Sequence, residues 1–202
     1  GGGALSVYAG LSGDQRTALH LQHLKGFVLI AERVAQSDPA AAAILVQQGK
    51  LEAYDTAPAE FGALDIAAIN AAGDAARAPA EIRQTLQRAG SAIDTARNAL
   101  PVNHADLAVR MGDLTVALYR NATLDPAAID PIEYQHAYGA ALGARDALVA
   151  GEAALKRQDA AAYAESLAEI DRLMALFPSI TAPDTPPTYQ DVLRQSSRVR
   201  LA

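Results

Sequence analysis

The chain has 202 residues and a net charge of −6, and half of its residues are apolar. It has only three lysines and no basic patch, which argues against nucleic-acid binding, because phosphates are bound by clustered cations. No apolar run reaches the ~18 residues of a membrane-spanning helix, no signal peptide is recognisable, and the absence of cysteine excludes disulfides and iron–sulfur clusters.

Alanine dominates the apolar residues, with 47 in the chain. It is the best helix former and a poor strand former, so this composition favours closely packed helices over sheets. We therefore predict an all-α, up-and-down bundle of about seven or eight helices. In chain order, the predicted helices cover residues 14–36, 39–54, 58–72, 79–99, 104–120, 131–157, 160–176 and 188–201.

Most of these helices begin after a residue that can cap the first turn with its side chain. The best example is the sequence Asp-Pro-Ile-Glu at 130–133, where an aspartate caps, a proline opens the helix and a glutamate completes a capping box. The predicted caps are Ser12 (with Gln15 as its capping-box partner), Asp38, Asn103, Asp130, Asp159 and Thr188.

The connections between predicted helices are short, with one exception. Residues 177–189 contain four prolines and predict an extended strap before the last helix. Residues 71–81 are interpreted as a helix–helix connection. No linker is long or polar enough to separate domains, so we predict one helical-bundle domain over residues 1–202.

Two segments suggest an internal repeat. Residues 22–31 (QHLKGFVLIA) and 135–144 (QHAYGAALGA) share Gln-His-x-x-Gly and later alanines, and each lies in a long helix followed by a second one. The hypothesis is that residues 14–54 and 131–176 are related helical hairpins; the alternative is chance similarity in an alanine-rich chain. In the repeat, Gly26 and Gly139 would allow close approach of a neighbouring helix.

Three of the four histidines fall on helix faces predicted to be buried. His20 and His23 share a face with Phe27, Ile30 and Val34, at the spacing of a helix in a bundle. We expect His23 to be buried and His20, one turn nearer the helix start, to be more exposed. In the repeat alignment, His23 corresponds to His136 and His20 to Glu133.

These four residues are the candidate metal ligands. Imidazole and carboxylate groups at (i, i+3) can reach one ion, and helical bundles build iron sites from Glu-x-x-His. His20, His23, Glu133 and His136 therefore predict a site for a divalent metal or iron. The alternative, which the incomplete ligand set favours, is that the histidines bind no cofactor and only contribute to packing. A pocket for a non-metal ligand is the third option.

Enzymatic chemistry has no recognisable motif in this chain. No nucleophile elbow, P-loop or dinucleotide fingerprint occurs, so we predict no enzymatic activity. His104, beside a helix cap, is expected to be solvated. The tyrosines at 119, 134, 138 and 163 are expected in the core or in an interface.

Two segments resemble a known group of proteins. Residues 23–34 (HLKGFVLIAERV) and 133–148 (EYQHAYGAALGARDAL) are similar to helices of bacterial cell-envelope helical-bundle proteins of the imelysin and iron-uptake lipoprotein type. The resemblance implies an all-α fold, a periplasmic or membrane-anchored location, and a link to iron or other metals.

Two functional classes follow. The first is a non-enzymatic binding protein of the bacterial envelope, with a metal at the four residues above. The second is a structural or protein–protein interaction bundle without a small-molecule site, acting with a protein partner or as a homodimer.

Overall fold

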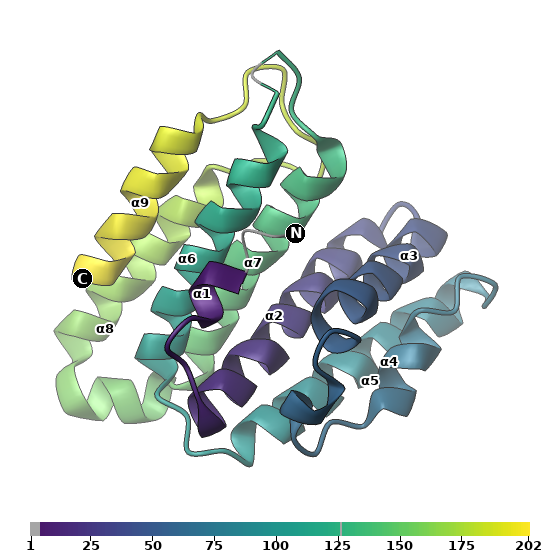
Figure 1. The fold of residues 1–202 in the computed structure, drawn as a ribbon, viewed down its shortest axis with the longest axis horizontal. Helices are drawn as coiled ribbons and strands as arrows, with labels where there is room; N and C mark the ends of the chain where they lie inside the picture. Colours follow the sequence, from purple (N-terminus) through teal and green to yellow (C-terminus); the bar gives the residue numbers. More distant parts are fainter. Residues whose placement is uncertain (1–4, 126) are drawn as a thin grey trace. The chain divides into compact units, whose positions relative to one another are not determined.

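The computed structural model describes residues 5–125 and 127–202, and it confirms the predicted all-α class (Figure 1). Within those residues there is no strand, and eight α-helices have seven or more residues. None of the helices described there combines the length and apolar character needed to cross a membrane. The elements are α1 (Leu5–Tyr8), α2 (Gly13–Val34), α3 (Pro39–Gly49), the π-helical turn η2 (Lys50–Tyr54), the 3-10 turn η3 (Pro58–Phe61), α4 (Ile66–Ala72), α5 (Pro79–Asn98), α6 (His104–Ala122), α7 (Pro131–Ala150), α8 (Glu152–Ala175) and α9 (Tyr189–Leu201).

The helices form two compact units. The α2–α5 unit comprises Leu11–Val102, and the α6–α9 unit comprises Asn103–Ala202 together with α1. The single-domain assignment and the repeat both stay predictions. Each unit does contain a long helix followed by a second helix packed on it, α2 with α3 and α7 with α8. Gly26 and Gly139 are both buried.

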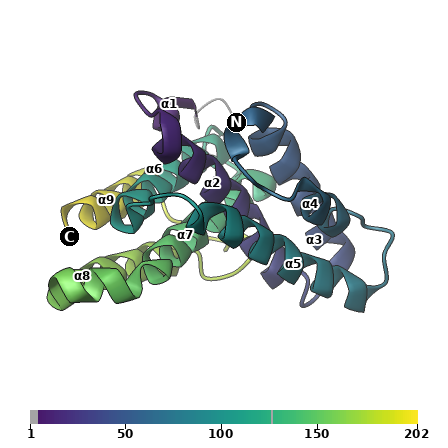
Figure 2. The same cartoon turned by 90° about the horizontal axis from the view of Figure 1, so that it is seen from below.

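In the α2–α5 unit, α3 and α5 pack on α2, and α4 contacts both α3 and α5 (Figure 2). Fourteen of the 22 residues of α2 are buried. Because α2 receives neighbours on several sides, polar residues on it must find partners inside the protein rather than water. The polar side chains of α2 are therefore expected to pair with side chains of the neighbouring helices and turns.

The predicted helix over residues 58–72 was wrong. Gly62 adopts a positive φ of 56°, a conformation that glycine tolerates and that ends the 3-10 turn η3. The helix restarts at α4, where the Asp65 side chain accepts a hydrogen bond from the N–H of Ala67. The predicted helix over 39–54 is α-helical only as far as Gly49, and its last five residues form the π-helical turn η2.

The α6–α9 unit is a four-helix bundle. Each helix contacts the next, and α9 closes the ring by packing on α6 (Figure 1). Its core holds Phe177, whose ring contacts three tyrosines at centroid distances of 5.4–5.6 Å: Tyr119, Tyr134 and Tyr138. These tyrosines and Tyr163 are buried, which confirms the prediction that they are core residues.

The predicted helix over residues 131–157 is interrupted at Gly151. A Cβ at this position would lie 2.5 Å from Cβ of His104, so only glycine allows α6 to approach here. The chain bends again at Asp159, whose backbone is extended (φ −163°, ψ 97°) inside α8. Its carboxylate accepts a hydrogen bond from the N–H of Ala162 at 3.0 Å, as expected of the predicted cap.

Most of the other predicted caps form the expected side-chain hydrogen bond. Ser12 precedes α2, but its side chain makes no cap hydrogen bond, so the capping box with Gln15 was wrong. Thr188 forms a capping box with Asp191, in which both reciprocal hydrogen bonds are present. Side-chain caps are confirmed at Asp38, Asn103 and Asp130.

The proline-rich strap is fastened to the bundle by side chains. The Tyr119 hydroxyl donates to the carbonyl of Pro187, and the Tyr134 hydroxyl donates to the carbonyl of Ser179 at 3.1 Å. Burial raises the pKa of Tyr119 and of Tyr134 to about 12. Both phenols therefore stay protonated and remain donors across the physiological pH range.

Candidate functional site

The structure places the four predicted metal ligands on two helices. His20 and His23 lie on α2 in the α2–α5 unit, and Glu133 and His136 lie on α7 in the α6–α9 unit. On each helix the two residues are about one turn apart, as their spacing predicts. Convergence of all four residues on one ion stays a prediction.

His20 is as buried as His23, and the expectation that it would be more exposed was wrong. Both residues expose 5 % of their surface. The η3 turn covers His20: the Phe61 ring lies 5.2 Å from the imidazole, centroid to centroid. Because the sequence predicted a continuous helix over 58–72, it gave no indication that this turn would fold back onto α2.

The His20 imidazole is part of a small charge cluster. Its Nε2 lies 2.5 Å from Glu60 Oε2, and the same oxygen accepts a hydrogen bond from Arg16 Nε at 2.9 Å. Burial lowers the pKa of His20 below 6.5, against the opposing effect of Glu60. The Arg16 hydrogen bond lowers the pKa of Glu60. A separation of 2.5 Å leaves no room for an ion coordinated by both atoms, since each metal bond alone is about 2 Å long.

His23 is buried, as predicted, on the same face of α2 as Phe27. The two rings lie 5.6 Å apart, centroid to centroid, at a tilted angle of 33°. This packing is what the face defined by His20, His23 and Phe27 predicts for a core helix.

Glu133 and His136 have a different geometry. His136 Nδ1 lies 3.7 Å from Glu133 Oε2, which is beyond hydrogen-bonding distance. The Glu133 Oε2 atom is buried and accepts no hydrogen bond from the described residues. Burial lowers the pKa of His136 below 6.5, while the charges of Glu133 and Asp130 oppose that effect. The imidazole is therefore neutral at physiological pH, the form that binds metals.

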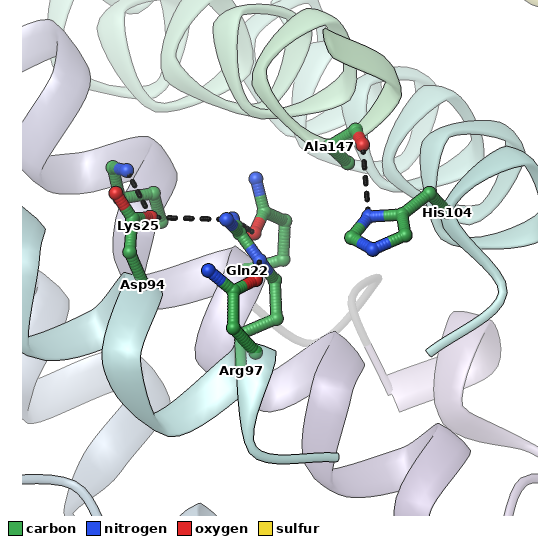
Figure 3. A network of polar contacts seen from close by, with 7 residues as sticks. Gln22, Lys25, Asp94, Arg97, His104 and Ala147 are labelled. Atoms are coloured by element: carbon green, nitrogen blue, oxygen red, sulfur yellow. Dashed lines mark hydrogen bonds and ion pairs between the residues drawn. The ribbon is translucent and has the colours of Figure 1, made fainter. Parts of the chain in front are cut away.

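The fourth histidine is structural. His104 is half-buried rather than fully solvated, and its Nδ1 lies 3.1 Å from the carbonyl oxygen of Ala147 on α7 (Figure 3). Because a carbonyl can only accept, Nδ1 must be the protonated ring nitrogen. The hydrogen bond ties the first turn of α6 to the last turn of α7, beside the close approach at Gly151.

A buried charge network in the α2–α5 unit was missed by the sequence interpretation (Figure 3). Lys25 Nζ on α2 lies 2.5 Å from Asp94 Oδ1 on α5, and Arg97 Nη2 lies 3.2 Å from the same oxygen. Arg97 Nη1 also donates to Gln22 Oε1 at 2.7 Å. The side chains of Lys25 and Arg97 are only 6 % and 3 % exposed, so Asp94 compensates two buried cations.

One sequence signal could have revealed this network. Lys25 is one of three lysines and stands inside the apolar run HLKGFVLIA, where a solvated lysine is unexpected. A buried lysine requires a carboxylate partner, but the partner is 69 residues away in sequence. The periodicity of one helix cannot identify it.

Compared with protein-family models, characterised proteins and solved structures, the chain matches none of them. The function must therefore be inferred from the groups described above. The similarity to envelope helical-bundle proteins stays a prediction from the sequence.

Proposed function

We propose that this chain is a non-enzymatic binding protein that holds a divalent metal ion at Glu133 and His136. The observation that carries the proposal is the 3.7 Å separation of His136 Nδ1 and Glu133 Oε2. Two ligands of a tetrahedral zinc ion, each about 2.0–2.2 Å from the metal, lie about 3.4 Å apart. The two atoms are thus close to the spacing of two ligands on one ion, while His20 and Glu60 are too close together.

The protonation states support the same assignment. Burial keeps the His136 imidazole neutral, so an ion does not have to displace a proton from it at physiological pH. The buried Glu133 oxygen, which accepts no hydrogen bond from the described residues, would gain a cation as partner. Two protein ligands leave the remaining coordination positions to water or to further side chains.

The resemblance described from the sequence supports two further parts of the proposal. It favours iron as the bound metal and the bacterial cell envelope as the location. One imidazole with one carboxylate is chemically suitable for both zinc and iron. Zinc, which has no redox chemistry, is therefore the practical probe, and ferrous iron under anaerobic conditions is the second.

Isothermal titration calorimetry with zinc chloride tests the site. We expect stoichiometric heat from the unmodified chain, and a loss of affinity of at least about tenfold in both Glu133→Gln and His136→Gln, since each removes one of two ligands. His20→Gln is the matched control, because it removes an equally buried imidazole that is already in contact with Glu60. Circular dichroism establishes that the variants are folded.

The absence of saturable heat, or an equal loss in all three variants, would contradict the metal proposal. The structural or protein-interaction bundle would then be the better description of the protein.

A further inference from the structure

A pocket of about 360 Å³ lies between α6 and α9 in the α6–α9 unit, with residues of α1 at its edge. This volume falls within the range of small-molecule sites, about 300–1,000 Å³. Helix α9 runs beside α6, and α1 contacts α6 (Figure 1). The pocket contains neither Glu133 nor His136, so it is separate from the proposed metal site.

The charges around the pocket are unequal. Asp113 on α6 pairs with Arg200 on α9, so these two largely cancel. Arg120, an exposed residue of α6, also lines the pocket, and its guanidinium is in no ion pair with the described residues. In a chain of net charge −6, this leaves one uncompensated positive charge at the pocket. An anion is the ligand that this charge favours.

The position of that charge follows from the helix geometry. Arg120 lies about two turns after Asp113 on α6, and Tyr189 lies about three turns before Arg200 on α9. The two helices run in opposite directions (Figure 1), so Arg120 and Tyr189 lie toward the end of the pocket away from the Asp113–Arg200 pair.

A second observation points to a ligand at this place. Ser196 lines the pocket and is 4 % exposed, yet its hydroxyl makes no hydrogen bond with the described residues. Ser197, its neighbour on α9, instead bonds its hydroxyl to the carbonyl of Leu193 on its own helix at 2.9 Å. The hydroxyl lines the pocket, where a polar atom of a ligand can replace water as its hydrogen-bond partner.

A hollow on the α2–α5 unit provides a contrast. It is larger, about 680 Å³, but its one buried polar side chain is Thr85, whose hydroxyl donates to the carbonyl of Ile82 at 2.9 Å. The other polar residues lining it are exposed. Volume alone therefore does not distinguish a site, and an exposed arginine lines both places, Arg88 in the hollow and Arg120 in the pocket; the difference is the Ser196 hydroxyl.

We propose that the α6–α9 pocket binds a small organic anion, a carboxylate or a phosphate ester. The anionic group contacts Arg120, because a guanidinium matches the oxygens of either group with two parallel hydrogen bonds. The body of the ligand packs on apolar residues of the lining, such as Val116 and Leu193, and one polar atom of it bonds to Ser196.

Protein-observed NMR titration with benzoate, phenyl phosphate and inorganic phosphate tests this proposal. We expect saturable shifts of α6 and α9 amides with benzoate, phenyl phosphate or both, at a dissociation constant below about 1 mM. Stronger binding of one of them identifies the preferred anionic group. Inorganic phosphate, which lacks an apolar body, is expected to bind more weakly than phenyl phosphate.

Three variants make the test specific. Arg120→Gln should weaken binding at least about tenfold, the usual loss when a hydrogen bond to a charged group is removed. Ser196→Ala should weaken it severalfold, and it fits the site because it only removes an oxygen. Arg198→Gln is the control, since Arg198 is an exposed arginine of α9 that does not line the pocket.

Binding that is unchanged in Arg120→Gln, or that falls equally in Arg198→Gln, would overturn the proposal, because general charge attraction would then explain it. So would the absence of saturable shifts with all three probes.

Discussion

Two polar pairs of the α2–α5 unit differ in spacing from one pair of the α6–α9 unit. In the α2–α5 unit, the paired polar atoms lie directly against each other: Lys25 Nζ is 2.5 Å from Asp94 Oδ1, and His20 Nε2 is 2.5 Å from Glu60 Oε2. In the α6–α9 unit, His136 and Glu133 remain 3.7 Å apart, and Ser196 lines a pocket without a hydrogen bond to the described residues.

The spacing of the paired atoms distinguishes pairs that stabilise the fold from a pair that can accept an ion. Two opposite charges in contact neutralise each other, and their removal costs stability because a partner is left buried and unpaired. At 3.7 Å the Glu133 and His136 atoms are beyond hydrogen-bonding distance of each other, and their spacing is that of two ligands of one ion. We therefore expect the close pairs of the α2–α5 unit to contribute to stability, whereas binding is proposed for the Glu133–His136 pair and for the α6–α9 pocket.

The largest expected effect is on the charge network. Asp94→Asn removes the carboxylate that compensates Lys25 and Arg97, and should lower the free energy of unfolding by about 2–3 kcal/mol. This is less than the ~3–5 kcal/mol of a fully buried pair, because the Asp94 side chain is 38 % exposed. Urea denaturation measures the change.

Asp184→Asn, on the exposed strap, is the matched control and should change stability by less than about 0.5 kcal/mol. If Asp94→Asn is equally neutral, the network does not stabilise the α2–α5 unit, and the comparison between the units fails.

The next effect concerns helix packing in each unit. Gly151→Ala places a Cβ 2.5 Å from Cβ of His104, and should destabilise the chain by about 1–3 kcal/mol through overpacking. Gly90→Ala, inside α5, meets its nearest atom at 3.5 Å and should be neutral or stabilising by up to about 1 kcal/mol. Thermal denaturation of both variants compares them. Equal effects would mean that α6 and α7 do not approach each other as closely as described.

The sequence predicted much of what depends on local interactions, although the Ser12–Gln15 capping box was wrong. The helical class follows from alanine content and apolar periodicity, and caps such as Asp38 and Asn103 act within one helical turn. It did not predict the partners of Lys25 or the burial of His20, because both depend on contacts between segments far apart in the chain. It also missed the Gly62 break, since a helix with one glycine has nearly the same pattern as two helices.

The candidate site was predicted in part. The residue types at Glu133 and His136 could be identified from spacing. The distance between their ligand atoms could not, because it depends on side-chain conformations that the surrounding helices determine. For the same reason, the contrast between Glu133–His136 and His20–Glu60 became visible only in the structure.

The smallest expected effect is a pH dependence of stability. His20 and His136 both have a folded-state pKa below 6.5, so the unfolded chain binds their protons more readily. The contribution of the two neutral histidines to the free energy of unfolding is complete well above pH 6.5. It is lost as the pH falls through their folded-state pKa values. The slope is at most about 1.4 kcal/mol per pH unit for each histidine.

Urea denaturation at about pH 7.5 and pH 5.5 measures this dependence. His20→Gln and His136→Gln should each reduce the loss of stability on acidification, whereas Arg198→Gln should not, because arginine does not titrate in this range. A loss of stability that is the same in all three variants and in the unmodified chain would show that other groups cause it.

The central claim is that the open Glu133–His136 pair binds metal while the close His20–Glu60 pair does not. The most direct test is a zinc titration followed by long-range proton–nitrogen NMR of the imidazole nitrogens, which is feasible because the chain has four histidines. We predict that the Nδ1 signal of His136 shifts on zinc binding and that the ring signals of His20 stay in place. A shift confined to His20, or no shift of His136 at saturating zinc, would contradict the claim.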